Sequence, residues 1–325
     1  MTRRRPRDAG SREYTHERLL AEQNGPVLTV TIQRPPRNFF DEKMAIELDQ
    51  LTKALRHDKS VRAVIFRGAG DTYITHFDVP SLLAAAERAP FPVGFRTARA
   101  IAAAARLVPQ RRPRPTGRRG VVRDALFMAR TYAALGRLSR LDKVVIAEIN
   151  GLSLGMGLIF ALNCDIRTIA EDAQVGFVES GISVLAGAGG TQRLTRSVGT
   201  SRAMELLLEG SIFTAGQAVE LGLAHHVFAR DELHAQTMAI AQRLAHRTPA
   251  IVKEIKRSVY ETATRPSPRS LTAEAAGFML VLTSPASRPQ LRAYADYLTA
   301  HHDNLSDAAV LEGWPALLDP EGHQP

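Results

Sequence analysis

Three glycine-rich turns, each next to a strand-like or helix-like run, constrain the fold of this chain most. The first, at 68–78, follows an apolar, β-branched run, and the second, at 150–157, follows another such run and opens a helix. The third, at 186–194, also leads into a helix. Such turns expose backbone N–H groups to a ligand, and two converging N–H groups can stabilise an oxyanion. Glycine also serves tight packing, but three such turns indicate a ligand-binding α/β protein.

Strands alternate with helices up to about residue 249, and this order is typical of α/β folds with crossover connections. Asp41 precedes a helix that its side chain can cap. Beyond residue 249 the pattern is helical only. The predicted strands cover 27–32, 61–66, 144–149 and 165–169, and the predicted helices cover 42–57, 97–108, 121–140, 155–163, 200–208, 214–221 and 231–247.

The positive charge of the chain is concentrated in two segments. The 325 residues carry a formal net charge of +9, but residues 1–12 contribute +4 and residues 86–140 contribute +11, so the remainder carries −6. The first segment has neither an apolar stretch nor an amphipathic face, so we expect a disordered tail over 1–18 rather than a secretory signal. Prolines and a glycine among the arginines of 110–119 predict a loop between two helices.

The composition excludes several classes of protein. A membrane-spanning helix needs about 18 uninterrupted apolar residues, and no stretch of the chain reaches that length. The single cysteine, Cys164, can form neither an internal disulfide nor a thiolate metal cluster. His225-His226 has no acidic or cysteine partner in register, and phosphate-binding and dinucleotide-binding motifs are missing. We therefore expect a cytoplasmic protein without a metal, a membrane partner or a separate cofactor.

Four motifs follow one another between residues 143 and 223, and a weaker match covers about 25 to 85. The motifs are KVVIAEING at 143–151, NCDI at 163–166, GGTQRL at 189–194 and AVELGL at 218–223. In sequence and order they resemble the crotonase superfamily, which is the enoyl-CoA hydratase/isomerase family.

The resemblance implies a fold and a ligand. The fold is an α/β spiral of ββα units with a helical C-terminal region, and the ligand is an acyl-CoA thioester. We accordingly expect a core over 19–248, with a basic insertion at about 86–140, and a helical region over 249–325 that serves oligomerisation. The resemblance also implies a homotrimer or a hexamer, with coenzyme A present only as part of the substrate.

Two backbone N–H groups bind the thioester oxygen in this family and stabilise an enolate. By position, the resemblance assigns these groups to Thr75, which opens the turn Thr75-His-Phe-Asp78, and to Met156, in the middle of Gly155-Met-Gly157. The side chains differ from the small residues that are usual there, but a backbone donor survives a change of side chain. His76 and Phe77 add bulk next to the ligand.

Hydratases of the family use two glutamates, because water addition needs one group for water and another for the proton on carbon. The first position is Ile159 here, which cannot transfer a proton, and the second is Glu179. A third acid, used by dienoyl isomerases, would fall at Gly187 and is absent. An isoleucine in the pocket also favours a raised pKa for a nearby carboxylate. One carboxylate can still move a proton between two carbons of an enolate, which is the chemistry of a double-bond isomerase.

Several neighbouring residues are predicted to contact the substrate. Asp78 is expected to hold its turn through backbone contacts rather than to take part in chemistry. His76 titrates near neutrality in its free form and is a candidate acid, base or hydrogen-bond donor, although a structural role for it is favoured. The predicted substrate-binding set is His76, Phe77, Asp78, Gly155, Gly157, Ile159 and Gly187.

Two other functions fit parts of the sequence. One keeps the enolate and changes the outcome to decarboxylation, C–C bond cleavage or a specialised secondary-metabolite step. The other is a crotonase homologue that binds RNA through its arginines and has little catalytic activity. Against RNA binding, the aromatic residues of 86–140 are not interleaved with the arginines as stacking platforms require. Some of these arginines are instead expected to meet the phosphates of coenzyme A.

Overall fold

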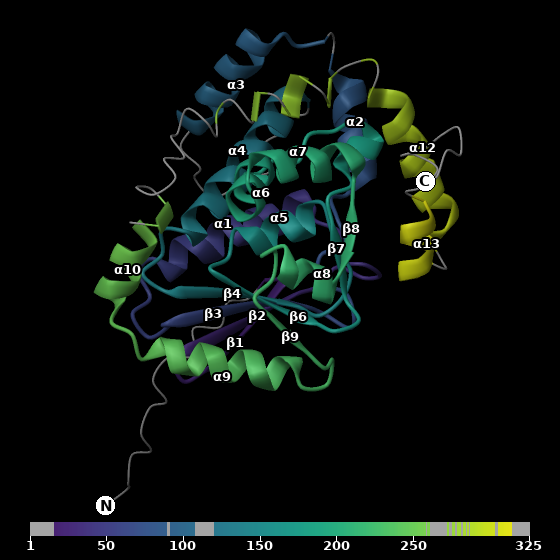
Figure 1. Ribbon diagram of the computed structural model, residues 1–325. Helices are drawn as coiled ribbons and strands as arrows, with labels where there is room; N and C mark the ends of the chain where they lie inside the picture. The colour runs from purple at the N-terminus through teal and green to yellow at the C-terminus, as the bar shows by residue number, and fades with distance from the viewer. Residues whose placement is uncertain are drawn as a thin grey trace, which may run out of the picture.

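A six-stranded sheet forms the centre of the molecule (Figure 1). The computed structural model describes residues 16–89, 92–107, 120–257, 259–260, 272, 275–276, 278–280, 282–283, 285, 287–302 and 305–313. The strands lie in the order β1-β2-β3-β4-β6-β9, with β1 antiparallel to β2 and every other neighbouring pair parallel. Their bounds are β1 Leu19–Asn24, β2 Val27–Ile32, β3 Ala63–Gly68, β4 Val144–Ile149, β6 Ile166–Ala170 and β9 His226–Phe228.

A smaller sheet of three short strands stands beside the first. In the order β5-β7-β8, β7 pairs parallel with β5 and antiparallel with β8. These strands are β5 Ser153–Leu154, β7 Gln174–Gly176 and β8 Ile212–Thr214. Because β5 lies directly between β4 and the next helix, this sheet carries the second glycine-rich turn.

Helices cover both faces of the central sheet (Figure 1). Side chains along β3 alternate between the two faces of the sheet. Ala63 and Ile65 pack against α9 on one face. Val64 and Phe66 point to the other face, where α1 and α5 lie. The bounds are α1 Glu42–Leu55, α2 Val79–Arg88, α3 Phe95–Leu107, α4 Val121–Leu138, α5 Met156–Leu162, a 3₁₀ helix η1 Glu179–Ile182, α6 Gly190–Val198, α7 Thr200–Glu209, α8 Ala215–Glu220, α9 Leu233–Ala245, α10 Pro249–Arg257, α12 Ser287–Ala300 and α13 Asp307–Glu312.

The start of α1 and its packing follow from the sequence. The Asp41 carboxylate accepts the Met44 N–H at 2.7 Å, which is the expected N-cap bond. Met44, Leu48, Leu51 and Leu55 of α1 are fully buried in the main core, whereas Ile46 is half-buried. On this helix lies α4 of the basic insertion, and Arg137 of α4 pairs with Asp49 and donates to Thr52 at 3.0 Å. An arginine of the insertion therefore serves internal packing.

The longer predicted elements are confirmed within a few residues, and the short strands were missed. β5, β7 and β8 hold two or three residues each, too few for an alternating pattern to show. β1 has only one fully buried side chain, so its sequence carries little apolar signal. The predicted disordered tail falls largely, and the arginine-rich loop at 110–119 entirely, outside the described residues. Within the described part of the chain, no helix has both the length and the apolar character to cross a membrane.

The edge strand β1 depends on a buried carboxylate. Glu47 on α1 accepts the backbone N–H groups of Glu17, Arg18 and Leu19 at 3.2, 2.7 and 3.0 Å. We predict that Glu47→Ala lowers the free energy of unfolding by about 2–3 kcal/mol, because it leaves three backbone donors at the start of β1 without their charged, buried acceptor. Urea unfolding measures this change. Glu22→Ala, at an exposed position of β1, is the matched control, and an equal loss in both variants would contradict the prediction.

Candidate active site

The three glycine-rich turns meet at one cavity of about 520 Å³. The first turn contributes His76, Phe77 and Asp78, the second contributes Gly155 and Met156, and the third contributes Gly187 and Ala188. The remaining wall comes mainly from α2, α3, α4 and the C-terminal residues 278–279 and 282–283. Its large apolar side chains include those of Phe40, Phe127, Met128, Ile182, Phe278 and Leu282. A largely apolar cavity with a few polar groups is typical of a small-molecule site.

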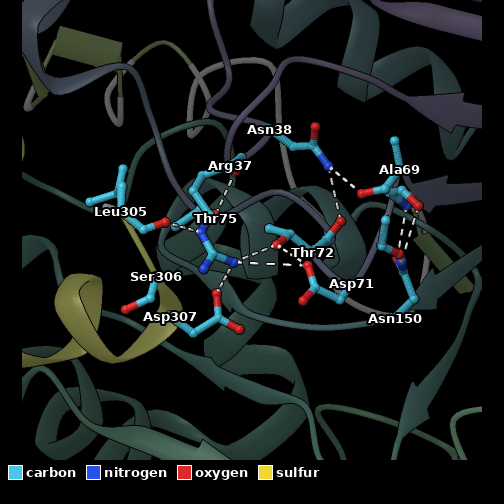
Figure 2. A network of polar contacts seen from close by, with 12 residues as sticks. Arg37, Asn38, Ala69, Asp71, Thr72, Thr75, Asn150, Leu305, Ser306 and Asp307 are labelled. Atoms are coloured by element: carbon cyan, nitrogen blue, oxygen red, sulfur yellow. Dashed lines mark hydrogen bonds and ion pairs between the residues drawn. The ribbon is translucent and has the colours of Figure 1, made fainter. Parts of the chain in front are cut away.

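The first turn runs from β3 to α2 and is fixed on both sides of Thr75. The Leu154 N–H donates to the Thr75 carbonyl oxygen at 2.7 Å. The Thr75 hydroxyl donates to the Arg37 carbonyl oxygen at 2.5 Å (Figure 2). Phe40 brackets the next residues, donating its N–H to the His76 carbonyl oxygen and accepting the Asp78 N–H. The Thr75 N–H itself has no hydrogen-bond acceptor among the described residues.

The second turn places Met156 at the first position of α5, where an N–H has no acceptor within the helix. Gly155 before it has a φ of +47° and donates its N–H to the Gly176 carbonyl oxygen at 2.8 Å. Gly157 after it packs against the first turn, since a Cβ there would lie 1.9 Å from the Ile74 carbonyl oxygen. The two turns are therefore in backbone contact, and their glycines allow this approach.

Asn150 ties the start of the first turn to the second. Its side-chain oxygen accepts the Gly68 N–H at 2.8 Å, and its amide donates to the carbonyl oxygens of Gly68 and Gly70 at 3.0 and 2.8 Å. On the other side of the first turn, Asn38 donates to the carbonyl oxygens of Ala69 and Thr72 (Figure 2). Two buried amide side chains thus fix the turn between the strands.

Glu179 opens η1 and lines the cavity beside the second turn. Its Oε2 accepts the Val178 N–H at 3.0 Å, and its Oε1 lies 2.8 Å from the point that a Cβ at Gly155 would occupy. Burial raises the pKa of Glu179 to about 7, because the apolar surroundings disfavour the charged form. This carboxyl group can therefore both take up and release a proton near neutral pH.

Four other carboxylates line the cavity, and each of them is paired with an arginine. Nε of Arg34 lies 3.0 Å from Oδ2 of Asp41, and Nη2 of Arg34 lies 2.9 Å from Oδ1 of Asp78. Arg123 pairs with Glu42, and Arg88 lies 2.8 Å from Asp124. No such cation pairs with Glu179 among the described residues. Glu179 is therefore the cavity carboxylate that is available for proton transfer.

Comparison with known proteins assigns the family. The family model described as enoyl-CoA hydratase/isomerase matches residues 116–304, which is more than half of the chain. The chain belongs to the enoyl-CoA hydratase/isomerase family. It is 29% identical over 244 residues to the short-chain-enoyl-CoA hydratase of Clostridium acetobutylicum, covering 74% of this chain and 80% of that one. It is 28% identical over 249 residues to the carnitinyl-CoA dehydratase of Salmonella enteritidis, covering 75% and 82%.

Solved structures show the same fold. An enoyl-CoA hydratase from Bacillus halodurans superposes with a TM-score of 0.70 and 19% identity, covering 85% of this chain and 99% of that one. At this identity the likeness shows the fold alone. It confirms the expected crotonase fold, in which the parallel sheet and its helices carry the three turns.

The other predicted site residues of this family member lie close to Glu179 or to the second turn. Ile159 on α5 lines the cavity and packs against Gly190, where a Cβ would meet it at 2.8 Å. Gly187 faces α4, since a Cβ there would lie 3.0 Å from the Tyr132 hydroxyl. Thr75 and Gly157 are not among the residues that line the cavity, although their neighbours His76 and Met156 are. The cavity thus has an apolar wall where family hydratases have a glutamate.

Asp78 differs from its expected role. Its backbone N–H does hold the turn, donating to the Phe40 carbonyl oxygen at 3.0 Å, but its carboxylate also binds Arg34 and Ser81. The expectation of backbone contacts alone was therefore incomplete. Asp78 is the N-cap residue of α2, but its side chain makes no cap bond there, because it is engaged by these two partners.

Sequence reasoning missed the part of the cavity wall that comes from α4 and from the C-terminal residues. Phe127, Met128 and Tyr132 lie on one face of α4, and Phe278 and Leu282 lie opposite. A helix was predicted over 121–140, and the spacing of these residues could have indicated its inward face. His225 accepts the Arg167 N–H at 3.0 Å, and the described residues hold no cluster of three or more potential metal ligands.

The contact between the two turns yields a prediction on stability. Gly157→Ala should lower the free energy of unfolding by about 3 kcal/mol, since its Cβ would collide with the Ile74 carbonyl oxygen and force the backbones apart. Thermal and urea unfolding measure this loss. Gly216→Ala on α8, where a Cβ meets open space, is the matched control and should be neutral or slightly stabilising. Equal free energies of unfolding for the two variants would contradict the predicted collision of a Cβ at position 157 with the Ile74 carbonyl oxygen.

Proposed function

We propose that this protein isomerises the double bond of an enoyl-CoA thioester through an enolate, with Glu179 as the only proton-transferring group. The supporting observation is that Glu179 is the one cavity carboxylate among the described residues without an arginine partner. The N–H groups of Thr75 and Met156 form the oxyanion hole in this proposal. Coenzyme A enters as part of the substrate and no further cofactor is needed.

The proposed reaction balances with one carboxylate. Ionised Glu179 takes a proton from C2 of a 3-enoyl thioester, and the electron pair moves to the thioester oxygen. The two N–H groups stabilise the resulting dienolate by hydrogen bonds that strengthen as negative charge develops. The protonated Glu179 then returns the proton to C4, the double bond shifts to C2–C3, and the carboxylate is regenerated.

Ile159 favours isomerisation over hydration. The relatives named above are a hydratase and a dehydratase, and water addition needs a group that orients and activates the water. Ile159 offers no hydrogen bond to a water molecule and lies on an apolar wall with Ala188 and Gly187. A buried water without polar partners is unfavourable, so the site excludes the second reactant of hydration.

The edge of the cavity suits the phosphates of coenzyme A. Arg88 and Arg123 line the cavity while 44% and 58% of their side chains remain exposed. Guanidinium groups bind phosphates well, and the two side chains pair with Asp124 and Glu42 in this structure. This local use of the arginines supports an acyl-CoA ligand and gives no support to the RNA-binding alternative.

Decarboxylation remains the second candidate function. Loss of CO₂ from a 2-carboxyacyl-CoA also leaves an enolate on the thioester oxygen, and Glu179 in its protonated form would then supply the proton to C2. The observation in its favour is the raised pKa of Glu179, about 7, which keeps a large protonated fraction at neutral pH. Release of CO₂ from methylmalonyl-CoA, faster than isomerisation of any 3-enoyl-CoA, would establish this reaction instead.

Removal of the carboxylate tests the proposed base. Glu179→Gln should lower kcat for isomerisation of 3-hexenoyl-CoA by about 10²–10⁴-fold, because the amide cannot accept the C2 proton. The conjugated thioester product is followed by its ultraviolet absorbance. Glu42→Gln, which alters a cavity carboxylate already paired with Arg123, is the control and should keep most of kcat. Equal effects of the two substitutions would contradict the assignment.

The pH dependence follows from the same group. The base must be ionised, so kcat/KM of the wild-type enzyme should rise tenfold per pH unit below pH 7 and level off above it. The residual activity of Glu179→Gln should not show this rise of kcat/KM with pH. A limb near pH 4.5 in the wild type would show that the reacting carboxylate is not held in an apolar environment.

Ile159 tests the choice between isomerase and hydratase. Ile159→Glu should raise the rate of water addition to 2-hexenoyl-CoA by about 10²-fold, because it restores a second proton-transferring group beside the second turn. Mass spectrometry detects the added water. Ile159→Gln, of the same size but unable to transfer a proton, should stay near the wild type. Fast hydration by the wild-type enzyme, unchanged in both variants, would overturn the proposal.

A further inference from the structure

A tyrosine of the C-terminal region reaches the first turn. Tyr294 lies on α12 and is fully buried, with its hydroxyl oxygen 3.1 Å from Nε2 of His76. The other ring nitrogen, Nδ1 of His76, lies 2.6 Å from the Phe77 carbonyl oxygen. A carbonyl oxygen only accepts, so Nδ1 carries the proton and Nε2 accepts the hydrogen bond from Tyr294.

The neutral form of His76 that this arrangement requires is the stable one. Burial lowers the pKa of His76 to about 4, against small opposing contributions from the Phe77 carbonyl and the Asp78 carboxylate. Phe39 packs against the imidazole with ring centroids 4.7 Å apart. The ring is thus held by hydrogen bonds at both nitrogens and by an aromatic neighbour, and it stays uncharged near neutral pH.

His76 is next to Thr75, whose N–H is one half of the proposed oxyanion hole. The direction of this N–H is set by the peptide plane between Ile74 and Thr75, and hence by the anchors of the turn. One anchor is the Leu154 N–H, which donates to the Thr75 carbonyl oxygen. The Thr75 hydroxyl and the backbone of Phe40 provide further anchors, and the His76 ring adds one that connects the turn to a helix distant in sequence.

We propose that Tyr294 is a positioning residue: by donating its hydroxyl to His76, it keeps the Thr75–Asp78 turn in the conformation that directs the Thr75 N–H at the thioester oxygen. This inference rests on the proposed function, since it concerns the same oxyanion hole. It gives the C-terminal helices a role in catalysis beyond the oligomerisation expected from the sequence.

The packing of α12 supports this role. Leu291 and Tyr294 belong to one buried cluster with Val79 of α2, which follows the first turn, and with Val178 and Ile182, which flank Glu179. Figure 1 shows α12 alongside α2 at the edge of the molecule. One helix therefore contacts both the turn that carries the oxyanion donor and the segment that carries the base.

A second link comes from α13. Arg37 donates from Nε to the Leu305 carbonyl oxygen at 2.6 Å and pairs with Asp307, while it also donates to the Thr72 hydroxyl at 3.0 Å (Figure 2). The carbonyl oxygen of Arg37 accepts the Thr75 hydroxyl. The C-terminal region thus contacts the first turn at two separate points, one through Arg37 and one through Tyr294.

Two matched tyrosines on α12 allow a direct test. Tyr294→Phe removes the hydroxyl and keeps the ring in the core, and it should lower kcat for 3-hexenoyl-CoA about tenfold with little change in KM. Tyr297→Phe removes a comparable hydrogen bond, the one from its hydroxyl to the Ala309 carbonyl oxygen at 2.6 Å, and should leave kcat unchanged. Equal kcat values for the two variants would overturn the inference.

A spectroscopic measurement separates positioning from stability. The infrared carbonyl band of butyryl-CoA labelled with ¹³C at the thioester should shift to lower frequency on binding, since the oxyanion hole polarises the bond. This shift should be smaller with Tyr294→Phe and unchanged with Tyr297→Phe. If Tyr294 only stabilised the fold, Tyr294→Phe would lower the melting temperature and leave the carbonyl shift intact. This result would also overturn the inference.

A double variant tests whether Tyr294 acts through His76. His76→Ala should reduce the carbonyl shift as Tyr294→Phe does, and the two changes together should cost no more than either alone. Additive losses would overturn the inference. If the wild-type protein shifts the band but does not isomerise 3-hexenoyl-CoA, the proposed reaction fails while the role of Tyr294 is still measured. Failure to bind any acyl-CoA would overturn both.

Discussion

The contact between two backbone turns is the constraint on which the site depends. Gly157 lies against the Ile74 carbonyl, and the Asn150 side chain bonds the backbone of Gly68 and Gly70. These bonds join the ends of two neighbouring parallel strands, β3 and β4, and place Thr75 and Met156 on either side of the contact. The order of the strands brings the two turns near each other. The close approach of their backbones then sets the positions of the Thr75 and Met156 N–H groups.

The carboxylates of the cavity fall into two groups: four of them pair with arginines, and among the described residues Glu179 does not. Asp41 and Asp78 share Arg34, and the resulting network joins the start of α1 to the start of α2. Glu179 accepts the Val178 N–H and has no arginine partner among the described residues, and burial raises its pKa to about 7. Ile159 also lines the cavity, at the position where the family resemblance places the first hydratase glutamate, and an apolar side chain there favours a raised pKa for a nearby carboxylate.

Much of this arrangement could be predicted from sequence, for reasons that differ between its parts. The strands around 61–66 and 144–149 are long and apolar, and Asp41 has the local chemistry of an N-cap, so these elements were predicted correctly. Strands of two or three residues leave no periodic pattern. The contribution of Tyr294 depends on a contact across 218 residues, and no local rule predicts which helix packs against which turn. The resemblance to the family identified Glu179 as a candidate site residue. It did not predict that the other carboxylates of the cavity pair with arginines.

The basic insertion shows how net charge misleads when it is assigned to a whole chain. Thirteen arginines between residues 86 and 140 suggest a polyanionic partner, but the described ones include several with acidic partners inside the molecule. Arg88 pairs with Asp124 within the insertion, whereas Arg123 and Arg137 pair with Glu42 and Asp49 on α1. These ion pairs hold α4 against α1, and α4 in turn presents Phe127, Met128 and Tyr132 to the cavity. The positive charge of the insertion therefore helps to shape the cavity, because its ion pairs fix the helix that forms one wall. The exposed parts of Arg88 and Arg123 remain available for an anionic ligand.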